Sequence, residues 1–380
     1  MMNEIASAGA APSGRLARLL SFLDSDPSNL TLLSDAAEAA LDERQPDIAV
    51  DLLARYAAIA PLPPRETNFA GIAALQVRQF DKAAEAFGAL FEAGTDDSAI
   101  RFNLGWARAN LKDFAGALEI VDDETARHLP QAAELRVQLM HQLGDFDGAG
   151  DAARAYAELY PDHRGLMAAV SVLALDINDE ALAARSAAIA GDHPDALTTL
   201  GTLALGDDHA TDALDLFERA LSANRNAPRA WIGLGLAKMM TGQADSAPAD
   251  LDKGAEMFGD HLGSWIAAGW AYFVNNDIAS ARARFETALA IDDTFAETHG
   301  SLAVIDILGG NLDEARRKSD VAMRLDRHCY SAALAKSLLA ASGGDQQTAR
   351  RIFEIAANTP IAGSNRTIGQ ALAKMGMGLN

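Results

Sequence analysis

Small and bulky apolar residues recur along this chain at a nearly constant interval. Trp231 and Trp265 stand 34 residues apart, and stepping by about that interval in both directions divides the sequence into ten units. The units begin at Leu30, Pro64, Ser98, Pro130, Arg164, Pro194, Pro228, Leu262, Ala296 and Tyr330. Position 20 of every unit is alanine, position 8 is small in nine of the ten, and position 24 is often bulky. An interval of this length predicts stacked helical repeats.

Each unit is predicted to form two helices joined by a turn. Glycine at position 15, as in Gly144, Gly242 and Gly310, marks the turn because glycine commonly ends a helix. At 3.6 residues per turn, positions 4, 7, 8 and 11 share one face of the first helix. The small residue at position 8 lets the second helix approach at the alanine of position 20. One unit cannot bury this face alone, so the units must stack.

The spacing of these residues resembles that of the tetratricopeptide repeat family. The residues that match the family pattern best are Trp231, Leu234, Gly235, Ala247 and Leu251 in one unit and Trp265, Gly269, Tyr272, Ala281, Phe285 and Ala288 in the next. The resemblance covers residues 30–360 and implies an all-α fold, a right-handed superhelical solenoid of about ten helix-turn-helix repeats. Arg136 and Lys336 depart from the pattern at the normally apolar position 7, which predicts looser packing or outward polar groups there.

Four segments are expected along the chain. Residues 1–29 form an N-terminal tail that can include a capping helix, residues 30–193 a first stack of five repeats, residues 194–360 a second stack of five, and residues 361–380 a C-terminal capping segment. The boundary follows the fifth unit because that unit is only 30 residues long. Since Ala183 keeps position 20, the missing residues must follow it. A shortened second helix is therefore favoured over a bend between two stacks.

Charge and composition narrow the range of partners. The chain has 53 acidic and 32 basic residues, and its net charge of -21 disfavours nucleic acid and anionic lipid. No segment approaches the roughly 20 apolar residues that span a membrane, so membrane insertion is not expected. The first 14 residues do not form a secretory signal, and the single cysteine, Cys329, suits a reducing compartment. These features predict a cytoplasmic protein.

Catalytic and metal-binding motifs are not found in the sequence. The eight histidines include no pair three or four residues apart, and Cys329 has no cysteine partner. His328 is adjacent to Cys329, but neighbouring residues do not face each other, so a turn is favoured over a nucleophile and its base. Gly233 and Gly235 look like part of a dinucleotide loop, but no strand is predicted before them. We expect no enzymatic activity, no catalytic residue, no cofactor and no metal.

An apolar stripe on the first helices of three successive units is the candidate binding surface. In the family that the chain resembles, positions 2, 5, 9, 12 and 13 line a concave groove that binds peptide segments. The predicted partner-binding residues here are Ile232, Leu236, Met239, Met240, Ile266, Trp270, Phe273, Val274, Val304, Ile307 and Leu308. These helices are apolar on two faces, and methionine adds adaptable surface. A groove is favoured over the alternative, in which the stripe is buried between units or under the C-terminal segment.

A second candidate groove mixes aromatic, amide and imidazole side chains in the N-terminal half. Its residues are Phe102, Trp106, Asn110, Gln138 and His141. Side-chain amides of this kind can hydrogen-bond the backbone of an extended peptide. A solvated polar face is an equal alternative.

The preferred function is a non-enzymatic scaffold or adaptor that binds an apolar peptide or helix of another protein. The acidic exterior also favours a basic partner. One alternative is a regulatory or substrate-recruiting subunit of a separately encoded protein-modifying enzyme, which co-purifying activity would reveal. Another is a self-assembling array in which the stripe is a homo-oligomer interface, which the mass in solution would reveal.

Overall fold

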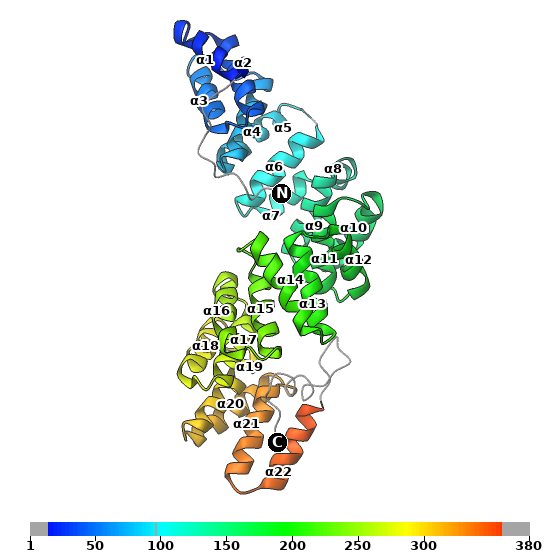
Figure 1. Cartoon of the computed structure of the whole chain (residues 1–380), viewed down its shortest axis with the longest axis vertical. Coiled ribbons are helices and arrows are strands. Elements are labelled where there is room, and N and C mark those ends of the chain that lie inside the picture. Colours follow the sequence, from blue (N-terminus) through cyan, green and yellow to red (C-terminus); the bar gives the residue numbers. More distant parts are fainter. Residues whose placement is uncertain (1–13, 96, 359–380) are drawn as a thin grey trace. The chain divides into compact units, whose positions relative to one another are not determined.

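The computed structural model describes residues 14–95 and 97–358, and these form helices joined by short turns (Figure 1). The first of two compact units, Met1–Ile177, holds α1 (Gly14–Ser25), α2 (Leu30–Asp42), α3 (Pro46–Ala57), α4 (Pro64–Gln76), α5 (Phe80–Glu92), α6 (Ser98–Asn110), α7 (Phe114–Ile120), α8 (Asp123–His128), α9 (Pro130–Gln142), α10 (Phe146–Leu159) and α11 (Arg164–Asp176). No strand occurs in the described residues, which confirms the predicted all-α class.

The second unit, Asn178–Asn380, continues the same pairing of helices. It holds α12 (Glu180–Ala190), α13 (Pro194–Gly206), α14 (Ala210–Ala223), α15 (Pro228–Met240), a 3-10 turn at Ala244–Ser246, α16 (Ala247–Phe258), α17 (Leu262–Val274), α18 (Ile278–Ile291), α19 (Ala296–Leu308), α20 (Leu312–Leu325), α21 (Tyr330–Ser342) and α22 (Gln346–Ala357). Each of the ten predicted unit starts, from Leu30 to Tyr330, is the first residue of a helix. The interval in the sequence is therefore the interval of the helix pairs.

The core of each repeat lies where a small residue of the first helix meets the second helix. The alanines at position 20 are all buried, and the ring of Phe87 on α5 is fully buried against Gly71 on α4. A Cβ atom placed on Gly71 would lie 2.6 Å from Cζ of that ring. Gly269 and Phe285 repeat this arrangement between α17 and α18. The absent side chain at position 8 is what makes room for the bulky side chain at position 24.

The turn between the two helices always places position 15 in the left-handed region of backbone conformation. Glycine occupies this position in Gly144, Gly242, Gly310 and Gly344, as expected, but the other six residues are not glycine. They are Arg44, Arg78, Lys112, Asn178, Asp208 and Asn276. A non-glycine residue is strained there by about 1 kcal/mol. The close packing of the two helices therefore imposes the turn geometry even where the residue disfavours it.

One second helix is broken, which the regular pattern did not predict. Residues after Ile120 leave the helix, and α8 restarts at Asp123 with Asp122 as its cap, accepting a hydrogen bond from the Thr125 amide at 2.8 Å. Arg136 lies half-buried and donates to the Val121 carbonyl at 2.7 Å. The arginine at the normally apolar position 7 thus satisfies a carbonyl that the break exposes.

The fifth repeat is short because its second helix is short, as the sequence favoured. α12 has 11 residues and is followed by its C-cap Gly191, whose φ is positive. The division between the two compact units falls in this repeat, between Ile177 and Asn178. Near the N-terminus, α1 buries Leu16 and Leu23 in the cluster that includes α2. The predicted tail before Gly14 and the predicted capping segment 361–380 lie outside the described residues.

We predict that Gly71→Ala destabilises the chain by about 1–3 kcal/mol, because its methyl group collides with the packed Phe87 ring. Gly88→Ala, on the second helix of the same repeat, is the matched control. A Cβ atom at Gly88 meets nothing within 4 Å, so helix propensity alone should stabilise that variant by about 0.5 kcal/mol. Urea unfolding followed by circular dichroism measures both. If Gly71→Ala and Gly88→Ala changed the free energy of unfolding equally, the fold would not require close approach of the two helices at position 8.

Candidate functional site

The predicted binding stripe lies on α15, α17 and α19 in the second unit. Each of these first helices packs against the second helix of its own repeat, and α19 also lies along α21. The stripe therefore borders the contact between α19 and the next first helix, α21. How much of it a partner can reach depends on how closely those helices approach each other.

Two of the predicted partner-binding residues are buried in the core instead. Met239 is 5% exposed and packs with Leu251 and Ala268 in a cluster to which α15, α16 and α17 contribute. Val304 is 1% exposed and packs with Ala315 and Ala335, between α19, α20 and α21. The prediction of an accessible stripe is wrong for these two residues, because the next first helix approaches closely enough to cover them. Their side chains belong to the core and are not accessible to a partner.

The middle of the stripe is aromatic and half-buried. The Trp270 ring lies edge-on to Phe273 at 5.0 Å between centroids and edge-on to the buried Phe285 at 5.6 Å. Ile266 packs against the same cluster, and Ile232 and Leu236 pack against the neighbouring one. These side chains are held by core contacts on one edge and reach solvent on the other. Such aromatic contacts fix the orientation of Trp270.

The ends of the three helices carry the accessible part of the stripe. Met240, Val274 and Leu308 each occupy the last residue of a first helix, at position 13, and we call them the position-13 row. Met240 and Val274 are half-buried, whereas the Leu308 side chain is 56% exposed. Ile307 beside it is half-buried and packs against the same core cluster as Leu338 and Leu339. A leucine as exposed as Leu308 leaves apolar area whose burial by a partner would be stabilising.

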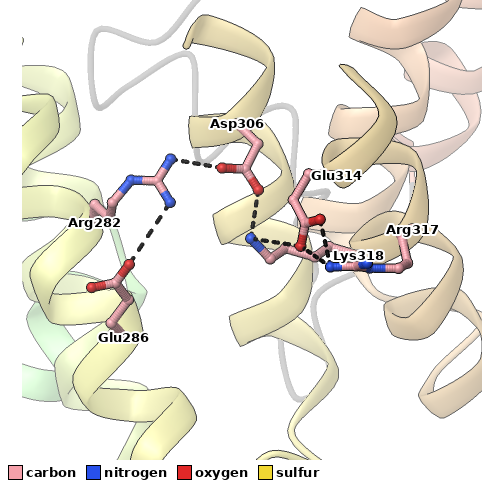
Figure 2. Close-up of polar contacts among 6 residues, drawn as sticks. All are labelled: Arg282, Glu286, Asp306, Glu314, Arg317 and Lys318. Atoms are coloured by element: carbon pink, nitrogen blue, oxygen red, sulfur yellow. Dashed lines mark hydrogen bonds and ion pairs between the residues drawn. The ribbon is translucent and has the colours of Figure 1, made fainter. Parts of the chain in front are cut away.

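A buried ion network joins α19 to α18 and α20 near the end of α19 (Figure 2). Asp306, two residues before Leu308, has a side chain that is only 3% exposed. Its Oδ1 accepts from Arg282 Nη2 at 2.7 Å, and its Oδ2 accepts from Lys318 Nζ at 2.6 Å. Arg282 comes from α18 and Lys318 from α20, so one carboxylate joins three helices. Glu314 lies 3.5 Å from the Lys318 amine on the solvent side.

Two opposing effects act on the pKa of the Asp306 carboxyl. Burial alone raises it, because desolvation disfavours the charged form. The hydrogen bonds from Lys318 and Arg282 outweigh burial and hold the pKa below its usual value. The Asp306 carboxylate is therefore charged near neutral pH. Arg282 also pairs with Glu286 at 3.8 Å and Lys318 with Glu314, so the two cations face one buried and two more exposed carboxylates.

The second candidate groove is largely used for internal contacts. The Phe102 and Trp106 rings stack at 6.4 Å and pack half-buried against a core cluster. The Asn110 amide donates to the Trp106 carbonyl of its own helix at 2.8 Å. His141 Nε2 lies 2.8 Å from Asp176 on α11. Only Gln138 is exposed, so these five residues offer a partner little hydrogen-bonding capacity.

Comparisons with known proteins agree on the repeat. A family model described as "Tetratricopeptide repeat" matches residues 70–133 and 198–260. These two segments are tetratricopeptide repeats. The structure is similar to a monomeric mutant of IFIT1 with Gppp-AAAA, at a TM-score of 0.52 and 12% identity, covering 90% of this chain and 93% of that one. It is similar to the human IFIT1 dimer with m7Gppp-AAAA at a TM-score of 0.51 and 12% identity, covering 90% and 92%.

A crystal structure of MamA matches more weakly, at a TM-score of 0.35 and 18% identity, over 41% of this chain and 91% of that chain. No curated protein sequence matches the chain. At 12% identity the two IFIT1 structures show a similar fold alone. No helix of the part that the structure describes is long and apolar enough to cross a membrane.

In three successive repeats a polar side chain at position 11 of the first helix contacts a polar side chain of the second helix. Lys238 bonds Asp250 at 2.5 Å, Asp306 bonds Lys318, and Tyr272 lies under the Arg284 guanidinium, 5.0 Å from its ring centre. In each case position 11 of the first helix meets position 23 of the second. The repeat pattern does not predict this layer, because it assigns position 11 to the apolar face. The available signal was a lysine and an aspartate 12 residues apart, as Lys238 and Asp250 in one repeat and Asp306 and Lys318 in another.

The Tyr272 hydroxyl also donates to Asp252 at 2.7 Å, and Arg284 bonds both oxygens of that carboxylate. Asp252 belongs to α16, so this group ties one repeat to the next. Burial and the hydrogen bond to Asp252 raise the pKa of the Tyr272 hydroxyl. The polar layer therefore links repeats as well as the two helices within a repeat.

We predict that Asp306→Ala destabilises the second unit by about 3 kcal/mol, because it leaves Arg282 and Lys318 facing each other without their carboxylate. Asp313→Ala is the matched control, since it removes a fully exposed carboxylate paired with Arg316 and should cost less than about 1 kcal/mol. Urea unfolding followed by tryptophan fluorescence tests both, because three of the four tryptophans lie in this unit.

The same carboxylate predicts how stability depends on pH. Its pKa is lowered by folding, so the unfolded chain binds the proton more readily. The contribution of Asp306 is complete above the ordinary aspartate pKa of about 4 and is lost as pH falls through the lowered value. The stability difference between wild type and Asp306→Ala should therefore shrink in acid. A difference that is constant from pH 7 to pH 3 would contradict the charged network.

Proposed function

We propose that this chain is a non-enzymatic scaffold that binds an apolar segment of another protein on the first-helix face of its second unit. The exposed side chain of Leu308, at the end of a row that continues through Val274 and Met240, is the observation that carries the proposal. Since a first helix is normally apolar on the one face that meets its partner helix, a second apolar face requires an explanation.

The chemistry of the face defines the partner. Positions 9, 12 and 13 of α15, α17 and α19 hold no charged residue. A charged segment would lose its hydration here without gaining a pair. The partner segment is therefore apolar, and the ring of Trp270 and the thioether of Met240 give it an anchor and an adaptable contact. An amphipathic helix that inserts one apolar edge fits these requirements.

A protein partner is favoured over RNA, although the similar structures of IFIT1 contain capped oligonucleotides. Binding a phosphate backbone depends on clustered lysine and arginine side chains, and the net charge of -21 opposes it. The acidic surface instead favours basic residues flanking the apolar segment of a partner. A cytoplasmic location belongs to the same proposal.

The test compares Leu308→Asp with Leu325→Asp as immobilised baits. Leu325 is also exposed, at 44%, and ends the second helix of the same repeat, away from the proposed face. Both variants should keep the helicity and melting of the wild type, because neither side chain is in the core. Leu308→Asp should lose capture of the partner by at least about tenfold, since a carboxylate is placed at the centre of an apolar contact. Leu325→Asp should retain it.

The proposal fails if a folded Leu308→Asp bait captures the same proteins as the wild type. It fails equally if both leucine variants lose capture together, because that result would mean a general loss of solubility or structure. A wild-type bait that captures only its own chain, with the mass of an oligomer that Leu308→Asp breaks, would instead establish the self-assembling array.

A further inference from the structure

Basic residues occupy the turn between the two helices in each of the first three repeats. Position 15 is Arg44, Arg78 and Lys112 there, so the three recur 34 residues apart. All three adopt the left-handed backbone conformation, with φ of 54°, 60° and 69°. In the seven repeats that follow, position 15 is glycine, asparagine or aspartate, which tolerate this conformation better than arginine or lysine. The turn itself therefore does not explain why a basic residue stands there.

The three basic side chains are exposed and have no internal ion pair. No carboxylate lies within ion-pair distance of any of them in the part of the chain that the structure describes. The acidic residues beside them in sequence have other partners. Glu43 accepts from the Leu16 amide of α1 at 3.0 Å, and Asp113 accepts from the Gly116 amide of α7 at 3.0 Å. The three cations therefore remain free to pair with an anion of another molecule.

A phenylalanine ring holds two of these cations beside the turn. Arg78 Cζ lies 5.6 Å from the centre of the Phe80 ring, and Lys112 Nζ lies 5.9 Å from the centre of the Phe114 ring. Each ring stands at position 17, at the start of a second helix, and is half-buried. The attraction between a cation and a ring face restricts the charged group to this place. Less side-chain freedom is therefore lost when an anion binds.

Exposed apolar side chains continue along the equivalent turns into the fourth repeat. Leu111 and Leu143, at position 14, are 47% and 45% exposed, and Phe146, at position 17, is 45% exposed. The Phe146 ring lies edge-on to His141 at 5.7 Å. In the five repeats from Pro194 onward, position 14 is instead aspartate, threonine, asparagine or glycine. Apolar side chains this exposed on neighbouring turns indicate a contact surface on the first unit.

Repeats that stack in one orientation place their equivalent turns along one edge. The residues of this edge are basic in the first three repeats and apolar in the third and fourth. We call them the turn row: Arg44, Arg78, Lys112, Leu111, Leu143 and Phe146. A segment that lies along the turn row meets positive charge at one end and apolar side chains at the other.

We propose that the turn row binds an extended acidic segment of another protein. Aspartate or glutamate side chains of that segment pair with the three cations, and apolar side chains at one of its ends contact Leu143 and Phe146. The turn row shares no residue with the first-helix face of the second unit. The chain therefore has two binding surfaces of different chemistry, one for an acidic segment and one for an apolar segment.

A polypeptide fits the turn row better than a nucleic acid does. A nucleic-acid backbone carries a negative charge at every nucleotide. Asp47, Asp81 and Asp113 lie one to three residues from the cations and would repel such a backbone between them. A protein segment can place carboxylates at the cations alone, with uncharged residues opposite these aspartates.

Fluorescence anisotropy of a labelled peptide with the full chain tests the proposal. The probe spans about 40 Å when extended, with about twelve residues, first glutamates and then leucines, and a peptide of reversed order covers the other chain direction. Peptides with glutamine or lysine in place of glutamate are the matched probes, and an oligouridylate of similar length is the phosphate probe. The wild type should bind one of the glutamate peptides at least about tenfold more tightly than the matched probes, and added salt should weaken this binding.

The decisive variant replaces the three cations by glycine: Arg44→Gly, Arg78→Gly and Lys112→Gly. Its affinity for the glutamate peptide should fall at least about tenfold. It should not unfold at a lower urea concentration than the wild type, because glycine suits the left-handed turn. A matched control removes the same charge from exposed positions of the same unit and should keep the wild-type affinity: Arg18→Gln, Arg55→Gln and Lys82→Gln.

The proposal is overturned if the glycine variant binds the glutamate peptide as tightly as the wild type, or if the glutamine control loses affinity equally. It is also overturned if the wild type does not distinguish glutamate from glutamine peptides. Tighter binding of the oligouridylate, lost in the glycine variant, would replace the acidic segment by a nucleic acid. If the glycine variant unfolds, the corresponding asparagine variant takes its place, since asparagine also tolerates the left-handed conformation, and the same loss of affinity is expected.

Discussion

The close contact between a residue without a side chain and a buried ring is the constraint on which the rest of this structure depends. A Cβ atom on Gly233 would lie 2.2 Å from the Phe217 ring, and one on Gly201 would lie 2.8 Å from it. The two glycines come from the first helices of successive repeats, α13 and α15, and the ring comes from α14 between them. One side chain therefore packs its own repeat and attaches the next. The constant interval in the sequence is the consequence, since the small and bulky positions of successive repeats must recur in register.

This packing also decides what remains for binding. Where a first helix is covered by its neighbouring helices, the middle of its inner face is half-buried or buried, and the end of α19 is its most exposed part. Met239 and Val304 are covered in this way, whereas Leu308, at the last residue of α19, is not. Asp306, two residues before that end, replaces apolar contacts between helices with ion pairs to Arg282 and Lys318. Burying such ion pairs costs desolvation free energy, but their geometry defines how the three helices are arranged.

The regular part of the fold could be predicted from the sequence alone. The alanines at position 20 and the small residues at position 8 identify the helix pairs, because only small residues permit the approach, and every predicted unit start is a helix start. Position 15 shows the limit of residue preference. Arg44 and Lys112 adopt the left-handed conformation that glycine favours, because the helices on either side determine the turn.

The irregular parts could not be predicted, since they depend on contacts between residues distant in sequence. The break after Ile120 is stabilised by Arg136 on the next helix, and the polar layer pairs side chains whose positions a repeat pattern treats as apolar. The sequence pattern predicts which residues belong to the binding stripe but not which of them are accessible to a partner. Periodicity assigns a residue to a face of its helix, but the exposure of that face depends on the neighbouring helix.

The central claim, that the end of the first-helix face in the second unit contacts a partner protein, can be tested most directly by site-specific photo-crosslinking. A benzophenone amino acid is introduced at Leu308 in one protein and at Leu325 in another, and both are irradiated in cells that express the chain. We expect a crosslink from position 308 to an apolar segment of a different protein, identified by peptide mass spectrometry. We expect no crosslink to that segment from position 325. Crosslinks to the same segment from both positions, or only to the chain itself from position 308, would contradict the proposed contact.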